Sequence, residues 1–149
     1  MPTKPNAVWS VDTNILVYAT GIDAQAVPKQ HVAQDLLARL FQSPRGCIAG
    51  QVLSEYLSVM VRRKTMAPAL ALETVATWSL AATVLGASAR AYEQAWQLAA
   101  KSQYQVWDAL IIAVCAEHGV RTLYSEDAGS LKRPLGVQVV NPFAGLNKP

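Results

Sequence analysis

Short runs of hydrophobic residues alternate along this chain with longer segments in which hydrophobic residues recur every three or four positions. The short runs predict buried strands at residues 7–11, 47–49, 82–85, 120–124 and 137–140. The longer segments predict helices at residues 29–42, 51–64, 67–80, 88–101 and 108–118. Short strands that alternate with helices are typical of an α/β fold with a mostly parallel sheet.

Capping and turn residues mark the boundaries of these elements. Thr13 and Asn14 are cap-type residues before the apolar run at 15–18, Ser88 is a candidate cap for the helix that follows it, and Gly119 ends the last helix. Loops are predicted at residues 21–28 and 43–46, and the three C-terminal residues are expected to be frayed. We find no repeat and no internal boundary, so residues 1–149 are expected to form one domain.

Composition favours a well-packed protein with some apolar surface left for a partner. Apolar residues make up 52% of the 149 positions and charged residues only 15%, against about 25% charged residues in an average domain. The net charge of +3 permits a polyanionic partner without requiring one. The two cysteines, Cys47 and Cys115, lack metal-binding spacing and are expected to be buried free thiols.

Targeting signals are not recognisable in this sequence. The apolar region at residues 7–19 is interrupted by Asp12 and lacks the small-residue pattern of a signal-peptide cleavage site. No apolar run approaches the ~20 residues that a membrane span needs. We therefore expect a cytoplasmic protein without a membrane partner.

Four acidic residues lie where an α/β fold would bring them together. Asp12 ends the first strand, Glu55 lies about one turn into the helix after the second strand, Asp108 opens the most apolar helix, and Asp127 follows the strand at 120–124. Strand ends and the starts of the following helices share one edge of a parallel sheet. Unpaired carboxylates there would repel one another, and a divalent cation would remove that cost. All-oxygen ligands favour Mg²⁺ or Mn²⁺ over zinc.

Each acid also has a simpler interpretation. Asp12 can be a turn or cap residue, and Asp108 can be a first-turn acid that complements the helix dipole. Glu55 lies off the apolar stripe of its helix and can be a solvated surface residue. The run at 125–127 can be a polar turn. The shared edge, rather than any single acid, indicates a metal site.

Four stretches of the chain resemble the acidic motifs of PIN-domain nucleases, and among these the bacterial VapC-type toxins of toxin–antitoxin pairs. The stretches are V-D-T-N-I-L-V-Y-A (Val11–Ala19), S-E-Y (Ser54–Tyr56), W-D-A-L-I-I-A (Trp107–Ala113) and Y-S-E-D (Tyr124–Asp127). The resemblance covers about residues 7–143 and includes the closing V-V-N-P-F (Val139–Phe143). The motifs occur together in the family's order and spacing, which makes them more specific than any one alone.

This resemblance implies a single PIN-like domain with a central, mostly parallel sheet of about four to five strands flanked by helices. It implies that the metal-binding and catalytic acids are Asp12, Glu55, Asp108 and Asp127. Thr13 and Asn14 match the polar pair that supports the first acid, and Ser125 matches the hydroxyl that supports the last. Glu126 falls on a variable position, so whether it binds metal stays open.

The resemblance also implies a Mg²⁺- or Mn²⁺-dependent endoribonuclease that inhibits translation, forms a homodimer and pairs with an antitoxin. We expect a metal-activated water as nucleophile, with one carboxylate helping to take its proton. The products should then carry 5′-phosphate and 3′-hydroxyl ends. The alternative ribonuclease route uses histidines to activate the 2′-hydroxyl, but His31 and His118 lie beside none of the acidic motifs.

Basic residues are expected to contact the RNA backbone. Arg62, Arg63 and Lys64 form a candidate cluster on the helix that carries Glu55, although a solvated helix end gives the same pattern. Trp107 is a candidate for stacking on a base. Alternatively, it is an aromatic residue of the core or of the domain edge.

Other functions fit less well. A haloacid-type phosphatase needs a second acid where Asn14 stands, and the glycine motifs of nucleotide-binding enzymes and serine hydrolases are absent. Two alternatives stay open: a catalytically idle RNA- or protein-binding module on the same fold, and a DNA-directed or structure-specific nuclease.

Overall fold

The computed structural model describes residues 8–21, 26–44, 46–127 and 132–146. The described strands are β1 (Trp9–Val11), β2 (Cys47–Ala49), β3 (Thr83–Leu85), β4 (Thr122–Tyr124) and β5 (Gln138–Val140). The described helices are α1 (Thr13–Thr20), α2 (Val27–Gln42), α3 (Gly50–Arg62), α4 (Pro68–Ala81), α5 (Ala89–Lys101), α6 (Val106–Glu117) and the short 3-10 helix η2 (Pro134–Gly136). Four predicted features lie outside the described residues: the strand start at Ala7, loop positions 22–25, the turn residue Arg45 and the tail at 147–149.

The strands pair in parallel, which confirms the predicted α/β class. One ladder has the order β1-β4-β5 and the other joins β2 to β3. The ladders meet where the buried Ser10 hydroxyl donates a hydrogen bond of 2.7 Å to the carbonyl oxygen of Cys47. A side chain thus joins β1 to β2, where the described residues have no backbone ladder between the two strands.

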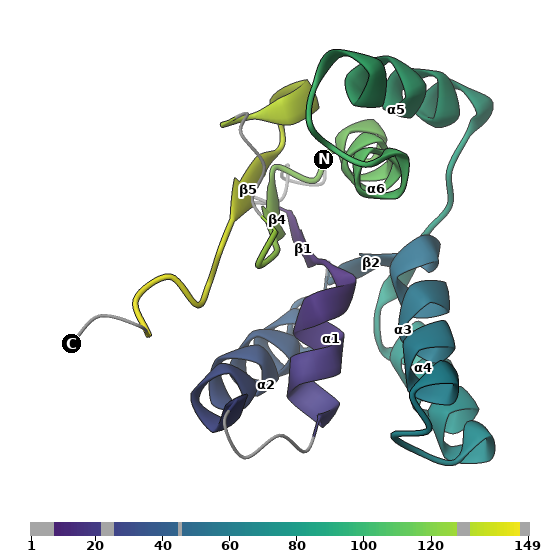
Figure 1. Ribbon diagram of the computed structural model, residues 1–149, viewed down its shortest axis with the longest axis vertical. Coiled ribbons are helices and arrows are strands. Elements are labelled where there is room, and N and C mark those ends of the chain that lie inside the picture. Colours follow the sequence, from purple (N-terminus) through teal and green to yellow (C-terminus); the bar gives the residue numbers. More distant parts are fainter. Residues whose placement is uncertain (1–7, 22–25, 45, 128–131, 147–149) are drawn as a thin grey trace.

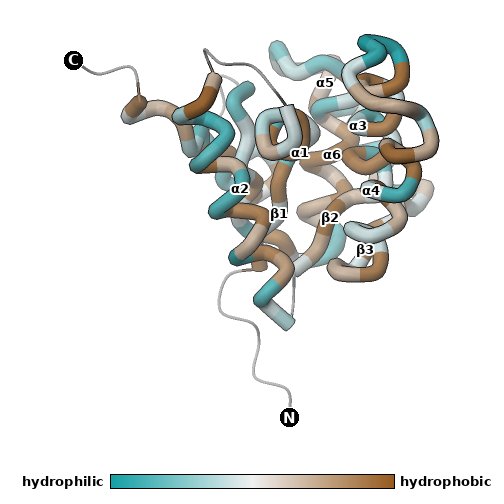
Figure 2. Tube along the Cα trace, turned by 90° about the horizontal axis from the view of Figure 1, so that it is seen from below, coloured by the Kyte–Doolittle hydropathy of each residue, from teal (hydrophilic) through white to brown (hydrophobic). Residues whose placement is uncertain are grey.

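The core lies between the strands and three packed helix pairs, α1 with α2, α3 with α4, and α5 with α6 (Figure 1). Helix α6 is the most deeply buried helix, since every residue from Ala109 to Cys115 is buried. Figure 2 shows β1 and β2 in hydrophobic colours near the centre, whereas α2 alternates between hydrophobic and hydrophilic positions. The almost continuous apolar sequence of α6 therefore reflects burial on all sides.

Most predicted element boundaries agree with the structure to within two residues, and the differences have local causes. Helix α2 begins at Val27 rather than Lys29, because Pro28 lies in its first turn, where its fixed φ suits a helix and its missing N–H costs nothing. Helix α6 begins at Val106 rather than Asp108, so the acid lies inside the first turn. The prediction of a loop as far as residue 28 was wrong in its last two residues.

The first helix is capped one residue earlier than expected. The N-cap of α1 is Asp12, so Thr13 and Asn14 are already helical. Two other predicted ends are observed: the Ser88 hydroxyl accepts from the N–H of Ala91 at the start of α5, and Gly119 has a φ of 75°, which suits glycine after a helix.

Both cysteines are buried free thiols, as predicted: Cys47 in β2 is 4% exposed and Cys115 in α6 is fully buried. Burial raises the pKa of both thiols. Among the residues that the structure describes, no helix has the length and apolar character needed to cross a membrane.

Replacing Ser10 by Ala should destabilise the fold by about 1–2 kcal/mol, because the buried Cys47 carbonyl loses its hydroxyl donor. Urea denaturation measures this free energy of unfolding. The control is Ser79→Ala, which removes an exposed hydroxyl on α4 and should change stability by less than about 0.5 kcal/mol. Equal effects of the two substitutions would contradict a joining role for Ser10.

Candidate active site

The parallel register of β1 and β4 brings the ends of these strands together. The ladder continues past the strands, since the N–H of Asp12 donates to the carbonyl of Tyr124 at 2.9 Å and the N–H of Ser125 donates to that of Val140 at 2.9 Å. Asp12 is 8% exposed. Its carboxylate accepts hydrogen bonds from the Ser125 hydroxyl at 2.8 Å and from the N–H of Thr13 at 2.7 Å. Asp12 is therefore both the cap of α1 and a carboxylate held at the edge of the sheet.

A second set of contacts holds the segment after β4. The Asn14 amide nitrogen lies 3.4 Å from the Ser125 hydroxyl and 3.5 Å from a carboxylate oxygen of Asp127. The Asn14 amide oxygen accepts from the N–H of Glu126 at 3.3 Å, and the Ser125 hydroxyl accepts from the N–H of Asp127 at 3.1 Å. The partners differ from those that the family resemblance implied: the Asn14 side chain, expected at Asp12, contacts Ser125 and Asp127. The Ser125 hydroxyl, expected at Asp127, donates to Asp12 and accepts from the N–H of Asp127.

Glu55 reaches the same region from α3. One carboxylate oxygen accepts from the Thr13 hydroxyl at 2.8 Å, and the other accepts from the Gln51 amide at 2.7 Å. The same Gln51 nitrogen donates to the carbonyl of Trp107 in α6 at 2.9 Å. Gln51 was not among the site residues expected from the sequence, although its position four residues before Glu55 puts both on one helix face.

Burial and mutual repulsion disfavour negative charge on two of the acids. Burial, together with the negative charges of Asp12, Asp127 and Glu55, raises the pKa of Asp108 to about 6. Burial also raises the pKa of Asp12, against the lowering effect of its hydrogen bonds from Ser125 and Thr13. The site therefore concentrates more negative charge than its own donors neutralise.

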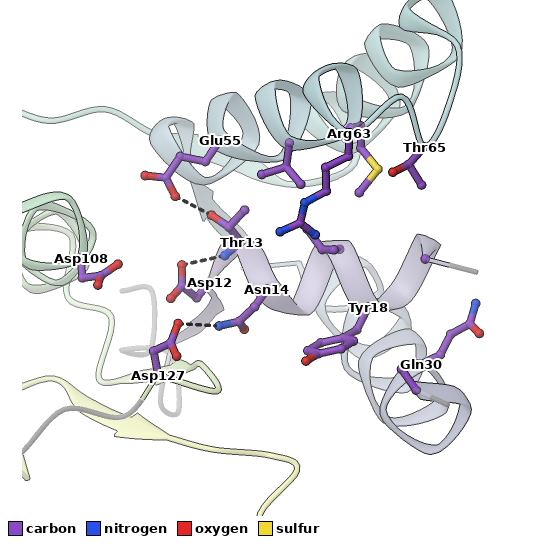
Figure 3. A pocket seen from close by; sticks show the side chains of 15 residues that line it. Asp12, Thr13, Asn14, Tyr18, Gln30, Glu55, Arg63, Thr65, Asp108 and Asp127 are labelled. Atoms are coloured by element: carbon purple, nitrogen blue, oxygen red, sulfur yellow. Dashed lines mark hydrogen bonds between the residues drawn. The ribbon is translucent and has the colours of Figure 1, made fainter. Parts of the chain in front are cut away.

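The four acids converge on one cavity of about 570 Å³ from four different elements (Figure 3). Asp12 comes from the end of β1, Glu55 from α3, Asp108 from α6 and Asp127 from the segment after β4. The other lining residues belong mainly to α1, α2 and α3: Thr13, Asn14, Val17, Tyr18, Gly21, Ala26, Gln30, Val59, Met60, Arg63 and Thr65.

The donor set suits a hydrated magnesium or manganese ion. Within the described residues, no three His, Cys, Asp or Glu side chains are spaced as a ready-made metal centre. Mg²⁺ needs no such cage, because it keeps several waters and is usually bound by one or two carboxylates. Carboxylates whose pKa values are raised by one another provide the charge that a divalent cation would neutralise.

Glu126 points to a different set of partners. Lys29 of α2 forms an ion pair and a hydrogen bond with one of its oxygens, and the Tyr18 hydroxyl donates to the other at 2.6 Å. Burial alone would raise the pKa of Glu126, but these two donors bring it below its ordinary value. The Lys29 ammonium also lies over the rings of Tyr18 and Phe143, at 5.0 and 5.7 Å from their centroids. Glu126 therefore ties the β4 segment to α2.

The basic residues expected near RNA divide into two groups. Arg63 lines the cavity, and Figure 3 shows its side chain extending from the end of α3 toward α1. Arg62 and Lys64 are exposed at the same helix end and are not among the lining residues. Trp107 is 61% exposed beside Asp108, which excludes a core position.

The histidines lie apart from the acids. His31 is exposed on α2, and His118 caps the C-terminus of α6, where its Nε2 lies 3.0 Å from the carbonyl oxygen of Gly86. Neither lines the cavity.

Residues 10–134 match the PIN domain family, and the chain belongs to that family. This match confirms the family resemblance that the acidic motifs carried. No curated protein matches the chain.

Solved structures of similar fold include a toxin and toxin–antitoxin complexes. VapC20 of Mycobacterium tuberculosis, described as a sarcin-ricin loop cleaving toxin, is 24% identical with a TM-score of 0.61, over 77% of this chain and 86% of that one. A toxin–antitoxin complex from Klebsiella pneumoniae is 17% identical with a TM-score of 0.64, over 91% and 98%. VapBC2 from Rickettsia felis, bound to a promoter DNA fragment, is 17% identical with a TM-score of 0.66, over 90% and 98%.

Stability of the metal-free protein should increase as the pH falls from 7.5 to 5. The folded-state pKa of Asp108, about 6, lies above its ordinary value, so its charge costs most above pH 6 and this cost is relieved as Asp108 becomes protonated. Relative to Asp108→Asn, the wild-type protein should gain about 1 kcal/mol over this range, after allowance for solvent screening. Urea denaturation at each pH in EDTA measures the difference. Parallel pH profiles of the two proteins would contradict the raised pKa.

The neighbouring residues Glu126 and Asp127 should differ when each loses its charge: one substitution should lower stability, and the other should weaken the effect of Mn²⁺. Glu126→Gln weakens the contact with Lys29 and should lower the melting temperature by a few degrees, which corresponds to about 1 kcal/mol. Adding Mn²⁺ should still raise the melting temperature of the Glu126→Gln variant. Asp127→Asn should reduce that Mn²⁺-dependent increase with little effect on the melting temperature of the metal-free protein. Thermal unfolding with Mn²⁺ and with EDTA tests both variants. If only Glu126→Gln loses the Mn²⁺ effect, Glu126 rather than Asp127 contributes to metal binding.

Proposed function

We propose that this protein is a Mg²⁺- or Mn²⁺-dependent endoribonuclease and the toxin of a toxin–antitoxin pair, which inhibits translation by cleaving RNA. The observation that carries the proposal is the convergence of four carboxylates from four elements on one cavity in a PIN domain. Family membership supports a nuclease, and the toxin folds among its structural relatives support the biological role. The catalytic unit is the single domain of residues 1–149, with its core at about 7–143.

The carboxylates of Asp12, Glu55, Asp108 and Asp127 would hold the cation. The chemistry that such a cation supplies is a lowered pKa of a bound water and stabilisation of charge on the phosphate and the leaving oxygen. The rest falls to side chains of this chain. Ser125 and the N–H of Thr13 hold Asp12, and one carboxylate of the four takes a proton from the attacking water.

RNA would approach the cavity past α3. Arg63 is a cation on the cavity wall. It would contact a phosphate next to the scissile bond. Arg62 and Lys64 would add attraction for the RNA backbone from the exposed end of the same helix. Trp107, exposed beside Asp108, is available for stacking on an unpaired base.

The partners in this proposal are a cognate antitoxin and a second copy of the chain, in the cytoplasm. Large apolar side chains on α4 and α5 support such partners, since Leu72 is 59%, Leu80 90% and Trp96 57% exposed. Large exposed apolar side chains of this kind are common at protein contact surfaces. The antitoxin-bound structural relatives support the first partner.

Purified protein free of antitoxin should cut total cellular RNA into discrete fragments with Mg²⁺ or Mn²⁺ and leave it intact with EDTA. The fragments should carry 5′-phosphate and 3′-hydroxyl ends. Asp108→Asn should slow cleavage about 100-fold or more, because loss of a ligand costs at least as much as loss of a residue that supports one. Asp35→Asn, an exposed acid on α2, is the matched control and should cleave normally.

A sarcin-ricin hairpin belongs in this experiment, since one structural relative is described as cleaving that loop. Fragments with cyclic 2′,3′-phosphate ends would contradict the metal–water route. Cleavage of DNA but not RNA would favour a DNA-directed nuclease. Metal binding by folded protein without cleavage of any nucleic acid would favour a binding module on this fold.

A further inference from the structure

One glutamine side chain links the two sides of the active-site cavity. Helices α3 and α4 form one packed pair and α5 and α6 another, and Figure 1 shows the two pairs as separate parts of the molecule. Gln51 lies in the first turn of α3, and its amide nitrogen donates both of its hydrogens. One goes to the carboxylate of Glu55 at 2.7 Å and the other to the carbonyl oxygen of Trp107 in α6 at 2.9 Å.

Both acceptors of this amide belong to the acid cluster or lie directly beside it. Glu55 is itself one of the four clustered acids, and Trp107 directly precedes Asp108, another of them. The second carboxylate oxygen of Glu55 is held by the Thr13 hydroxyl at 2.8 Å. Glu55 is therefore fixed from two directions, by α1 through Thr13 and by the first turn of α6 through Gln51.

The amide oxygen of Gln51 indicates that the hydrogen bonds of its nitrogen to Glu55 and Trp107 are not explained by fold stability. The amide oxygen of Gln51 is buried, and no group in the described part of the chain donates a hydrogen bond to it. A buried acceptor without a donor opposes folding, and an apolar side chain of similar shape would avoid this cost. The reversed amide would place this oxygen against the Glu55 carboxylate, so the nitrogen must face the acid.

We propose that Gln51 is a positioning residue that fixes the Glu55 carboxylate relative to Asp108 across the metal-binding cavity. This inference rests on the proposed function, because the geometry that Gln51 sets matters for binding a divalent cation and for cleavage. Two carboxylates on separate helices can share one cation and its waters only if their separation is controlled. Partners that orient metal ligands in this way typically change metal affinity or activity 10–100-fold when they are removed.

Two substitutions of Gln51 distinguish the role of its hydrogen bonds from the role of its packing. Gln51→Met keeps the length and apolar stem of the side chain but removes the donor, and Gln51→Asn keeps the amide but is one methylene too short to reach both acceptors. The matched controls are Gln97→Met and Gln97→Asn, since Gln97 is an exposed residue on α5. Each protein is measured for Mn²⁺ affinity by calorimetry, for melting temperature in EDTA, and for single-turnover RNA cleavage over a range of RNA concentrations.

Both Gln51 variants should bind Mn²⁺ about 10-fold more weakly and cleave with a maximal rate about 10-fold lower. The RNA concentration at half-maximal rate should change little, because Gln51 is not a lining residue of the cavity. The melting temperature of Gln51→Met in EDTA should stay constant or rise, since the substitution removes a buried, unpaired oxygen. The Gln97 variants should match the wild-type protein in every measurement.

Two results would overturn the inference. If Gln51→Met binds Mn²⁺ and cleaves like the wild-type protein, the side chain only fills space. If its Mn²⁺ affinity falls together with its melting temperature in EDTA, the role is structural. A wild-type protein that binds no Mn²⁺ and cleaves no RNA would instead refute the proposed function, and this outcome is distinguished by the wild-type measurements alone.

Discussion

The buried charge of Asp12 is the constraint on which the rest of this structure depends. A carboxylate that is 8% exposed needs donors, and the parallel pairing of β1 with β4 supplies one by placing the Ser125 hydroxyl next to it. The start of α1 supplies the other through the N–H of Thr13. These donors satisfy the hydrogen bonding of the Asp12 carboxylate but do not neutralise its negative charge. The charges of Glu55 and Asp127 add to the negative charge of the site. The fold therefore maintains an electrostatic cost at the position where a cation would remove it.

The side chains around the cavity carry the acids and also hold its walls in place, and several residues do both. Asp12, Glu55, Asp108 and Asp127 line the cavity, and each lies on a different element. The walls are joined by polar contacts between residues far apart in sequence: Thr13 to Glu55, Asn14 to Asp127, Gln51 to Trp107 and Lys29 to Glu126. Short strands of three residues provide little rigidity, so these cross-element contacts define the positions of the acids.

The sequence was sufficient to predict the α/β class, the family and most element boundaries, because burial and capping are local properties of the pattern. It also placed the four acids on one edge, since strand ends in a parallel sheet share that edge. It did not identify Gln51 or decide whether Glu126 binds metal. Both depend on which distant partner a side chain meets: Glu126 pairs with Lys29, 97 positions away, and Gln51 reaches a carbonyl 56 positions away. Periodicity carries no information on such pairings. The assignment of the acids as ligands stays a prediction until metal binding is measured.

The two buried thiols give this protein internal reporters of local opening. Cys47 lies in β2, directly before the helix that carries Glu55, and Cys115 lies in the helix that carries Asp108. A thiol reagent reaches either side chain only when the surrounding segment opens, so the rate of alkylation at each cysteine measures the opening free energy of one cavity wall. A ligand that binds both walls in the closed state slows alkylation at both positions by mass action. The unmodified chain thus allows the coupling between its two walls to be followed without an added label.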